Sequence, residues 1–150
     1  MDTSIQELRA RRAELIQALS SQGRNTELRR FAVLCARRTD LSGTDWNKLV
    51  EAAEQHALGG WSLAEMLEVR NKHAGAAIAA CVVGLNRGAS NAAAFLSAWQ
   101  STREDPAEAA RDSARMAAIW GAMRAGSKEP VEDQDAIGRQ VEALEQCVSH

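Results

Sequence analysis

Apolar residues recur every three or four positions along most of the chain, a spacing that places them on one face of an α-helix. In the first segment these residues are Ile5, Leu8, Leu15, Ile16 and Leu19. Glycine-containing breaks divide the pattern, so helices are predicted over about residues 4–19, 45–58, 63–86, 90–99 and 106–126, with a second helix that is capped by Asn25 or Thr26 and ends near RRTD (37–40), and a last helix after Pro130. Seven helices joined by short loops form a compact bundle.

Two of these helices have well-defined starts. Ser62 precedes one helix and Glu65 follows three residues later, so each side chain can accept a hydrogen bond from the other residue's backbone N–H. Asp105 and Glu108 have the same spacing, and Pro106 occupies the first helical position, where no N–H is needed. Local chemistry alone therefore specifies where these two helices begin.

Composition favours the same fold class. Alanine, the strongest helix former, is the most frequent residue, whereas the chain has no tyrosine, two phenylalanines and two prolines. A chain of 150 residues can bury a core of its own, so residues 1–150 are predicted to form a single all-α domain, a compact bundle of six to seven helices. Alanine pairs recur at an offset of 41 residues, which leaves open two related helical hairpins around a central alanine-rich helix pair.

The segment AGAAIAACVVGL, residues 74–85, has no charged residue, although 25% of the chain is charged. It is too short to cross a membrane, which takes about 20 apolar residues, and no membrane association is predicted. A helix that is apolar on all sides is normally buried. We therefore expect this segment to be the packing axis of the bundle, paired through its small residues with the helix over 106–126. Cys81 would be buried in it, and Ala80→Leu would overpack the core.

Charge is distributed unevenly, although the net charge is only −2. Residues 1–38 contain eight arginines against four acidic residues, and residues 104–150 contain ten acidic residues against five basic ones. We expect these regions to attract each other, either within the fold or between the two copies of a homodimer. A nucleic-acid-binding domain is normally more basic overall, so nucleic acid is not predicted as a partner.

No group of residues has the spacing that a metal site in a helical bundle requires. Glu54 and His56 are two residues apart and therefore point to different faces of a helix, and His73 has no acidic residue three positions before it. No serine or cysteine is paired with a base in a recognisable catalytic pattern. The chain is thus predicted to have no catalytic residue, no metal and no cofactor, and not to be an enzyme.

The three cysteines, Cys35, Cys81 and Cys147, form no CxxC motif. An odd number of cysteines is a poor basis for a disulfide framework, and the first residues form a charged amphipathic segment, so a reducing, cytoplasmic location is predicted. Cys35 and Cys81 lie in apolar segments and are expected to be buried. Cys147 is then the thiol expected to react in solution.

Six residues are candidates for contact with a protein partner: Arg29, Arg30, Arg37, Arg38, Trp46 and Trp99. The arginines give the second predicted helix a basic flank, and the tryptophans lie near helix ends, where interface anchors can occur. Two other interpretations stay open. The arginines can form ion pairs with the acidic C-terminal region, and the tryptophans can cover the edge of the core.

Two quoted segments, ELRRFAVLCARRT and KLVEAAEQHALGGWSLAEMLEVRNKHAGAA, carry a family resemblance over roughly residues 27–80. They resemble uncharacterised alanine-rich, all-helical bacterial proteins that share a Leu-Arg-x-Phe-Ala-x-x-Cys-x-Arg-Arg segment. More distantly, they are similar to helical immunity proteins of bacterial toxin systems. The resemblance implies a bacterial, cytoplasmic, non-enzymatic helical protein, and it supplies no catalytic residues.

These observations favour a non-enzymatic protein-interaction module, of adaptor, regulatory or immunity type, that acts through charged helix faces. The alternative is a helical bundle that binds a small ligand or a metal in a pocket between helices. Such a pocket would be lined by His56, Glu68, Arg70 and His73.

Overall fold

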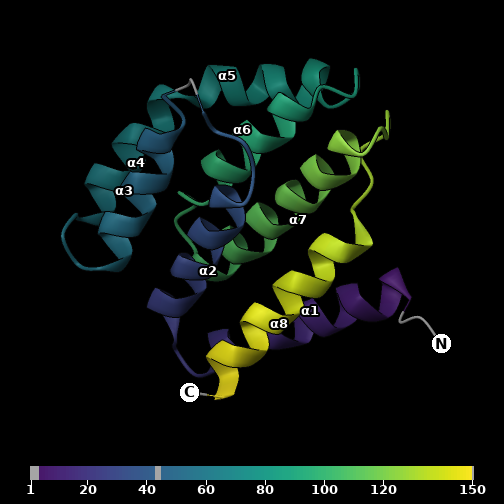
Figure 1. Ribbon diagram of the computed structural model, residues 1–150. Coiled ribbons are helices and arrows are strands. Elements are labelled where there is room, and N and C mark those ends of the chain that lie inside the picture. The colour runs from purple at the N-terminus through teal and green to yellow at the C-terminus, as the bar shows by residue number, and fades with distance from the viewer. Residues whose placement is uncertain (1–3, 43–44, 150) are drawn as a thin grey trace.

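The computed structural model describes residues 4–42 and 45–149, which fold into an all-helical bundle without strands (Figure 1). Eight α-helices and one π-helical segment make up this described part of the chain. They are α1 (Ile5–Ser21), α2 (Asn25–Arg37), α3 (Asn47–Ala57), α4 (Leu63–Lys72), α5 (Ala74–Ala79), η1 (Ala80–Gly84), α6 (Ser90–Gln100), α7 (Pro106–Arg124) and α8 (Gln134–Ser149). The predicted all-α class is therefore confirmed.

The number of helices differs from the prediction because the helix expected over residues 63–86 is divided. α4 ends at Lys72, and the backbone of His73, its C-cap residue, leaves the helical region with φ −105° and ψ 5°. α5 then continues into η1, where the Leu85 N–H donates to the Ala80 carbonyl at 2.9 Å, five residues back. A Cβ on Gly84 would lie 2.5 Å from the Ala92 Cβ, so the glycine permits a close approach to α6.

Both predicted helix starts are present in the structure. The Ser62 Oγ accepts a hydrogen bond from the Glu65 N–H at 3.1 Å, and the Glu65 carboxylate accepts one from the Ser62 N–H at 3.0 Å. Asp105 caps α7 by accepting from the Ala107 N–H at 2.9 Å, with Pro106 as the first helical residue. Each cap satisfies N–H groups that have no partner within the helix.

α7 is the central helix of the bundle, and its two sides belong to two apolar clusters. One cluster lies mainly among α2, α3, α6 and α7, and the other among α1, α2, α7 and α8. In α6 the seven consecutive residues 92–98 are buried, so that helix is enclosed on all sides. Where α6, α7 and α2 meet, the Ser97 Oγ donates to the Ser113 carbonyl at 2.8 Å, and the Ser113 Oγ lies 3.0 Å from the Ala32 carbonyl.

The prediction for residues 74–85 is wrong, because this segment lies at the surface. Ile78 is 67% exposed and Val82 63% exposed, and Cys81 is exposed as well. Only Ala77 is buried. The segment runs along one edge of the bundle (Figure 1), where α6 is the main helix against it, so its outer side has no cover among the described residues. Ala80 is only partly buried, so the prediction that Ala80→Leu overpacks the core is withdrawn together with the central placement of the segment.

The two ends of the chain are joined by ion pairs within the fold. The carboxylate of Glu132, just before α8, lies 3.0 Å from Arg9 Nε and 2.7 Å from Arg12 Nη2. The other terminal nitrogen of Arg12 donates to the Gln140 Oε1 at 2.8 Å, and Gln140 in turn donates to the Ala114 carbonyl at 2.9 Å. Of the two alternatives for the charged regions, attraction within one chain is therefore the arrangement present here.

Candidate functional site

The six residues predicted to contact a partner do not form one surface. The prediction for Arg29 is wrong, because its side chain is buried and cannot reach a partner. Arg29 is 1% exposed, and its guanidinium donates to the carbonyls of Ser101 (2.9 Å), Arg103 and Glu104 (3.0 Å). Burial lowers the pKa of Arg29 to about 10, against the opposing effect of Asp105. The side chain holds the end of α6 and the following loop, because a cation is favourable next to the free carbonyls of a helix C-terminus.

The sequence contained a signal for this burial. Ala32 and Ala36 follow Arg29 by three and seven residues, which is the spacing of one helix face, and both are fully buried. Arg30 is one position further on and is exposed. Two adjacent arginines therefore have opposite roles, and the small residues on the face of Arg29 distinguish them.

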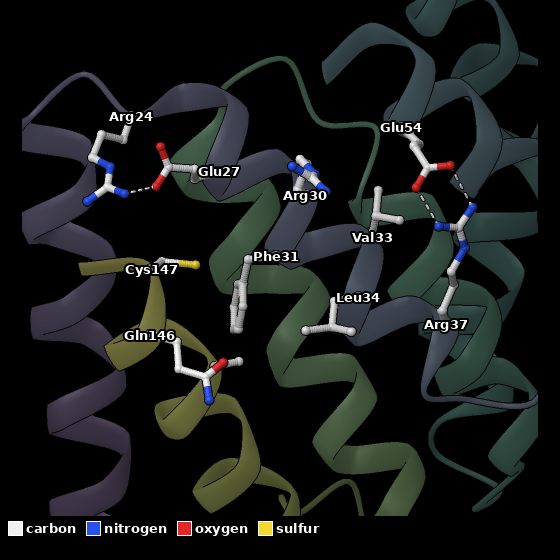
Figure 2. A pocket seen from close by; sticks show the side chains of 11 residues that line it. Arg24, Glu27, Arg30, Phe31, Val33, Leu34, Arg37, Glu54, Gln146 and Cys147 are labelled. Atoms are coloured by element: carbon white, nitrogen blue, oxygen red, sulfur yellow. Dashed lines mark hydrogen bonds and ion pairs between the residues drawn. The ribbon is translucent and has the colours of Figure 1, made fainter. Parts of the chain in front are cut away.

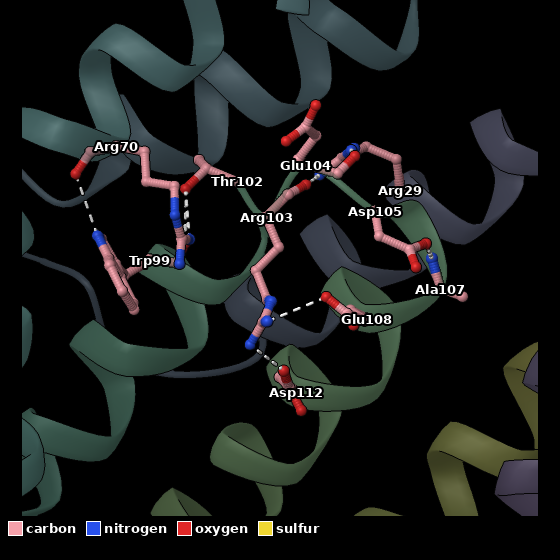
Figure 3. Close-up of polar contacts among 10 residues, drawn as sticks. All are labelled: Arg29, Arg70, Trp99, Thr102, Arg103, Glu104, Asp105, Ala107, Glu108 and Asp112. Atoms are coloured by element: carbon pink, nitrogen blue, oxygen red, sulfur yellow. Dashed lines mark hydrogen bonds and ion pairs between the residues drawn. The ribbon is translucent and has the colours of Figure 1, made fainter.

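Trp99 is also engaged within the fold (Figure 3). The Arg70 guanidinium lies 3.6 Å from the centre of the Trp99 ring and donates to the Trp99 carbonyl at 2.7 Å, while the indole N–H donates to the Arg70 carbonyl at 3.1 Å. Burial, and then the neighbouring Arg103 and Arg29, lower the pKa of Arg70 to about 10. This pair ties α4 to the end of α6, so Trp99 covers the core edge.

Arg103 completes a group of three arginines around residues 101–105 (Figure 3). Its guanidinium pairs with Asp112 at 2.7 Å and with Glu108 at 3.0 Å, both on α7. A cavity of about 530 Å³ adjoins this group and is lined by Arg70, Arg103 and carboxylates of the same region. Because these guanidiniums already bind carbonyls and carboxylates of the chain, we assign the group to the architecture of the bundle.

Residues 74–85 form the first free surface. We call Ile78, Cys81, Val82 and Val83 the apolar ridge, because all four are exposed. A groove of about 390 Å³ runs between the ridge and α6 and is lined mainly by small residues, four alanines and Gly84, with Trp46 and Phe95 among its walls. The Trp46 and Phe95 rings are 5.2 Å apart in a tilted arrangement, and Trp46 is half-buried. Of the two candidate tryptophans, Trp46 is therefore the one next to an open apolar surface.

The second free surface is a groove between α2 and α8 (Figure 2). It encloses about 750 Å³, and its apolar lining includes Phe31, Val33, Leu34 and Ala143. Three arginines of α2 or its cap, two glutamates, Gln146 and Cys147 complete the lining. We call this the α2–α8 groove. It contains Arg30 and Arg37 of the predicted residues, whereas Arg38 is exposed outside it.

Two ion pairs border the α2–α8 groove. Arg24 pairs with Glu27 at one end, and at the other end Arg37 donates twice to the Glu54 carboxylate, with one contact at 3.0 Å. The hydrogen bonds from Arg37 lower the pKa of Glu54, and the same bonds raise the pKa of Arg37. Arg30, between the two pairs, has no carboxylate partner among the described residues (Figure 2).

The cysteines are free thiols in three different environments. Cys35 is fully buried, as predicted, and burial raises its pKa to about 12. Burial also raises the pKa of Cys147, which is half-buried near Glu27. Cys81 is exposed on the apolar ridge, so it is the most accessible thiol, contrary to the prediction that named Cys147.

The polar lining suggested for a ligand pocket does not converge. The His56 Nδ1 is hydrogen-bonded to the Trp61 carbonyl at 3.0 Å and the His73 Nδ1 to the Val69 carbonyl at 3.0 Å. Each imidazole is therefore bound to a backbone carbonyl within five residues of it in the chain. Among residues 4–42 and 45–149 no three His, Cys, Asp or Glu side chains are grouped closely enough for a metal ion. None of the helices in the same ranges has the length and apolarity needed to span a bilayer.

Comparisons with protein-family models, with curated proteins and with solved structures find no match to this chain. The resemblance to alanine-rich bacterial proteins and to immunity proteins therefore stays a prediction.

Proposed function

We propose that the chain is a non-enzymatic protein-interaction module, of adaptor, regulatory or immunity type, and that a partner docks on the apolar ridge. The observation that carries the proposal is the exposure of Ile78, Val82 and Val83 within a run of twelve uncharged residues. Scattered exposed apolar residues are common, but a contiguous apolar patch on a soluble domain marks a contact surface. The π-helical turn beneath the patch is a further feature that is frequent at functional sites.

The size of the patch gives a measure of its contribution. Full burial of an Ile or Val side chain is favourable by about 1.5–3 kcal/mol. Burial of the exposed portions of Ile78, Val82 and Val83 by a partner would therefore contribute roughly 3–5 kcal/mol to binding. The groove beside the ridge, with Trp46 in its wall, offers a recess for a partner side chain. Together these features supply the apolar centre that a specific interface needs.

The charged helix faces, which the sequence suggested as the contact surfaces, support an interaction module less strongly than the ridge does. Most of their members already have partners in the chain, such as Arg12 with Glu132 and Arg37 with Glu54. Exposed ion pairs contribute little to affinity, since each side chain exchanges one solvated partner for another. We therefore place the main contact on the ridge and give the charges a role in orientation.

Two further parts of the proposal concern the setting. Three free cysteines, with Cys81 exposed, suit a reducing compartment, in keeping with a cytoplasmic location. The ridge carries no charge that would repel a second copy, so a homodimer formed through it is one form of the proposed interaction.

The test is site-specific photo-crosslinking in cells of the source organism. A photoreactive amino acid replaces Val82 on the ridge in one variant and Glu142, exposed on α8, in the control. We expect a discrete adduct from position 82 alone, and we expect Ile78→Asp to abolish it. An adduct of twice the chain mass identifies a homodimer.

Identical adduct patterns from positions 82 and 142, or no adduct from position 82, would overturn the proposal. An adduct that survives Ile78→Asp would do the same, because the charge lies one helical turn from the crosslinker. Circular dichroism of each variant confirms that the bundle is intact.

A further inference from the structure

The α2–α8 groove is separate from the apolar ridge, and its shape indicates what kind of partner it can hold. Arg30 and Arg37 are seven residues apart, close to two helical turns, so they lie on one side of α2, and Arg24, the N-cap residue of α2, lines the same groove at its other end. The thirteen residues of α2, Asn25–Arg37, correspond to about 20 Å of helix. A groove of this length that is open along one side matches a helix of about four turns better than a small molecule, which is normally enclosed on most of its surface.

The groove carries a net positive charge from the residues that line it. Two of its three arginines are paired with glutamates, whereas Arg30, midway along the groove, forms no ion pair among the described residues and reaches Glu54 only through its longer-range charge. The α8 wall contributes Ala143, Gln146 and Cys147, none of which is acidic. A partner therefore meets one positive charge on the α2 side and no competing negative charge on the α8 side.

The floor of the groove is apolar and contains Phe31 and Leu34. Leu34 is 38% exposed and lies beside the buried Phe31 in the groove (Figure 2). Phe31 and Leu34 are three residues apart on α2, so they present one continuous apolar strip below Arg30 and Arg37. Apolar residues at helical spacing on a partner would cover this strip.

We propose that the α2–α8 groove binds an acidic amphipathic helix of a partner protein. The apolar face of that helix packs on Phe31 and Leu34, and a carboxylate of the same helix pairs with Arg30. Gln146 and Cys147, which line the groove, belong to the C-terminal end of α8, and Figure 1 shows this end of α8 far from α5. The chain then has two separate contact surfaces, which is the property of an adaptor.

The experiment is selection of a displayed library of helical peptides, fourteen residues long and randomised on one face, against the full chain. We expect enriched peptides to carry apolar residues at helical spacing together with an Asp or Glu. Arg30→Glu should weaken their binding at least about tenfold, because attraction becomes repulsion at a partly desolvated contact. Replacing the peptide's acidic residue by lysine should restore binding to Arg30→Glu. The matched control is Arg139→Glu, the same charge change at an exposed α8 position outside the groove.

Several outcomes would overturn this inference. These are no enrichment over the control selection, enriched peptides without an acidic residue, or equal loss of binding in Arg30→Glu and Arg139→Glu. Binding of decanoate that depends on Arg30, without binding of any acidic peptide, would assign the groove to a small amphiphile instead. A ridge variant, Val82→Asp, should bind the peptides as the wild type does, so the groove and the ridge are tested independently.

Discussion

Arg29 and Arg30 offer the sharpest test of the fold, because the two are adjacent arginines with opposite surroundings. Replacement of Arg29 by methionine keeps much of the volume of the side chain but removes its charge and its hydrogen bonds. Three carbonyls at the end of α6 and in the following loop then lose their donor. The same replacement at Arg30 removes an exposed side chain that forms no ion pair among the described residues.

The expected cost follows from the hydrogen bonds. A hydrogen bond to a charged group contributes about 1.5–3 kcal/mol, and a buried acceptor left without a donor costs about 1–3 kcal/mol. These effects overlap, and loss of one partner from a buried ionic contact typically costs about 3–5 kcal/mol in total. We therefore expect Arg29→Met to destabilise the bundle by about 3–5 kcal/mol, a large part of the roughly 5–15 kcal/mol of a typical domain. Arg30→Met should stay within about 0.5 kcal/mol of wild type.

Urea unfolding followed by tryptophan fluorescence and by circular dichroism measures both variants. Arg29→Lys should be intermediate, since an ammonium keeps the charge but lacks the planar fork that reaches three carbonyls. If Arg29→Met loses less than about 1 kcal/mol, or no more than Arg30→Met, the carbonyls at the end of α6 do not depend on the guanidinium.

Four further predictions concern the core, the contact between η1 and α6, and the thiols. Ser113→Val should cost about 1–3 kcal/mol, because the single hydroxyl proton that the buried Ala32 and Ser97 carbonyls share at the junction of α2, α6 and α7 is lost, and an unchanged melting temperature would contradict this. Gly84→Ala should cost about 1–3 kcal/mol because its Cβ would meet the Ala92 Cβ, and a stabilised variant would show that η1 moves away freely. With a thiol reagent at pH 8, Cys81 should react first and Cys35 only on unfolding, which mass spectrometry of the labelled peptides can check. Because burial raises the pKa of Cys35 to about 12, its thiol ionises only in the unfolded chain above its ordinary pKa of 9.0, so stability should fall as pH rises from 9 to 12, and less so in Cys35→Ala.

Local signals in the sequence were reliable where local chemistry decides the structure. The capping box of Ser62 and Glu65 and the start of α7 at Asp105 appear as predicted, because each cap depends only on residues a few positions apart. The all-α class was predictable as well, because the high alanine content and the helical spacing of apolar residues are also properties of local sequence.

The sequence failed where burial depends on which other elements lie nearby. Residues 74–85 have the pattern of a buried helix, but burial on all sides also needs neighbours on all sides. α6 has those neighbours, and Phe95 and Leu96 in it are buried, whereas Ile78 and Val82 are not. Apolar composition alone therefore did not separate a core helix from a contact surface.

The candidate surfaces were predictable in part. Arg30 and Arg37 were identified from their spacing on α2, and the structure places both along one groove. The contribution of α8 to that groove was not accessible, because Cys147 is more than a hundred residues away from Arg37 in the chain. Trp99 and Arg29 were selected for polarity and position, yet their partners are carbonyls of the chain itself.

The side chain of Arg29 also bears on the order in which the chain folds during synthesis. Its acceptors lie 72 to 75 residues further on, and the partner of Arg12 at Gln140 lies 128 residues further on. A nascent chain that has reached only α5 holds both guanidiniums without their acceptors, and contacts between such distant segments form late. The N-terminal helices are thus expected to stay loosely packed on the ribosome until α6 and α7 have emerged, and the bundle closes only when α8 is released.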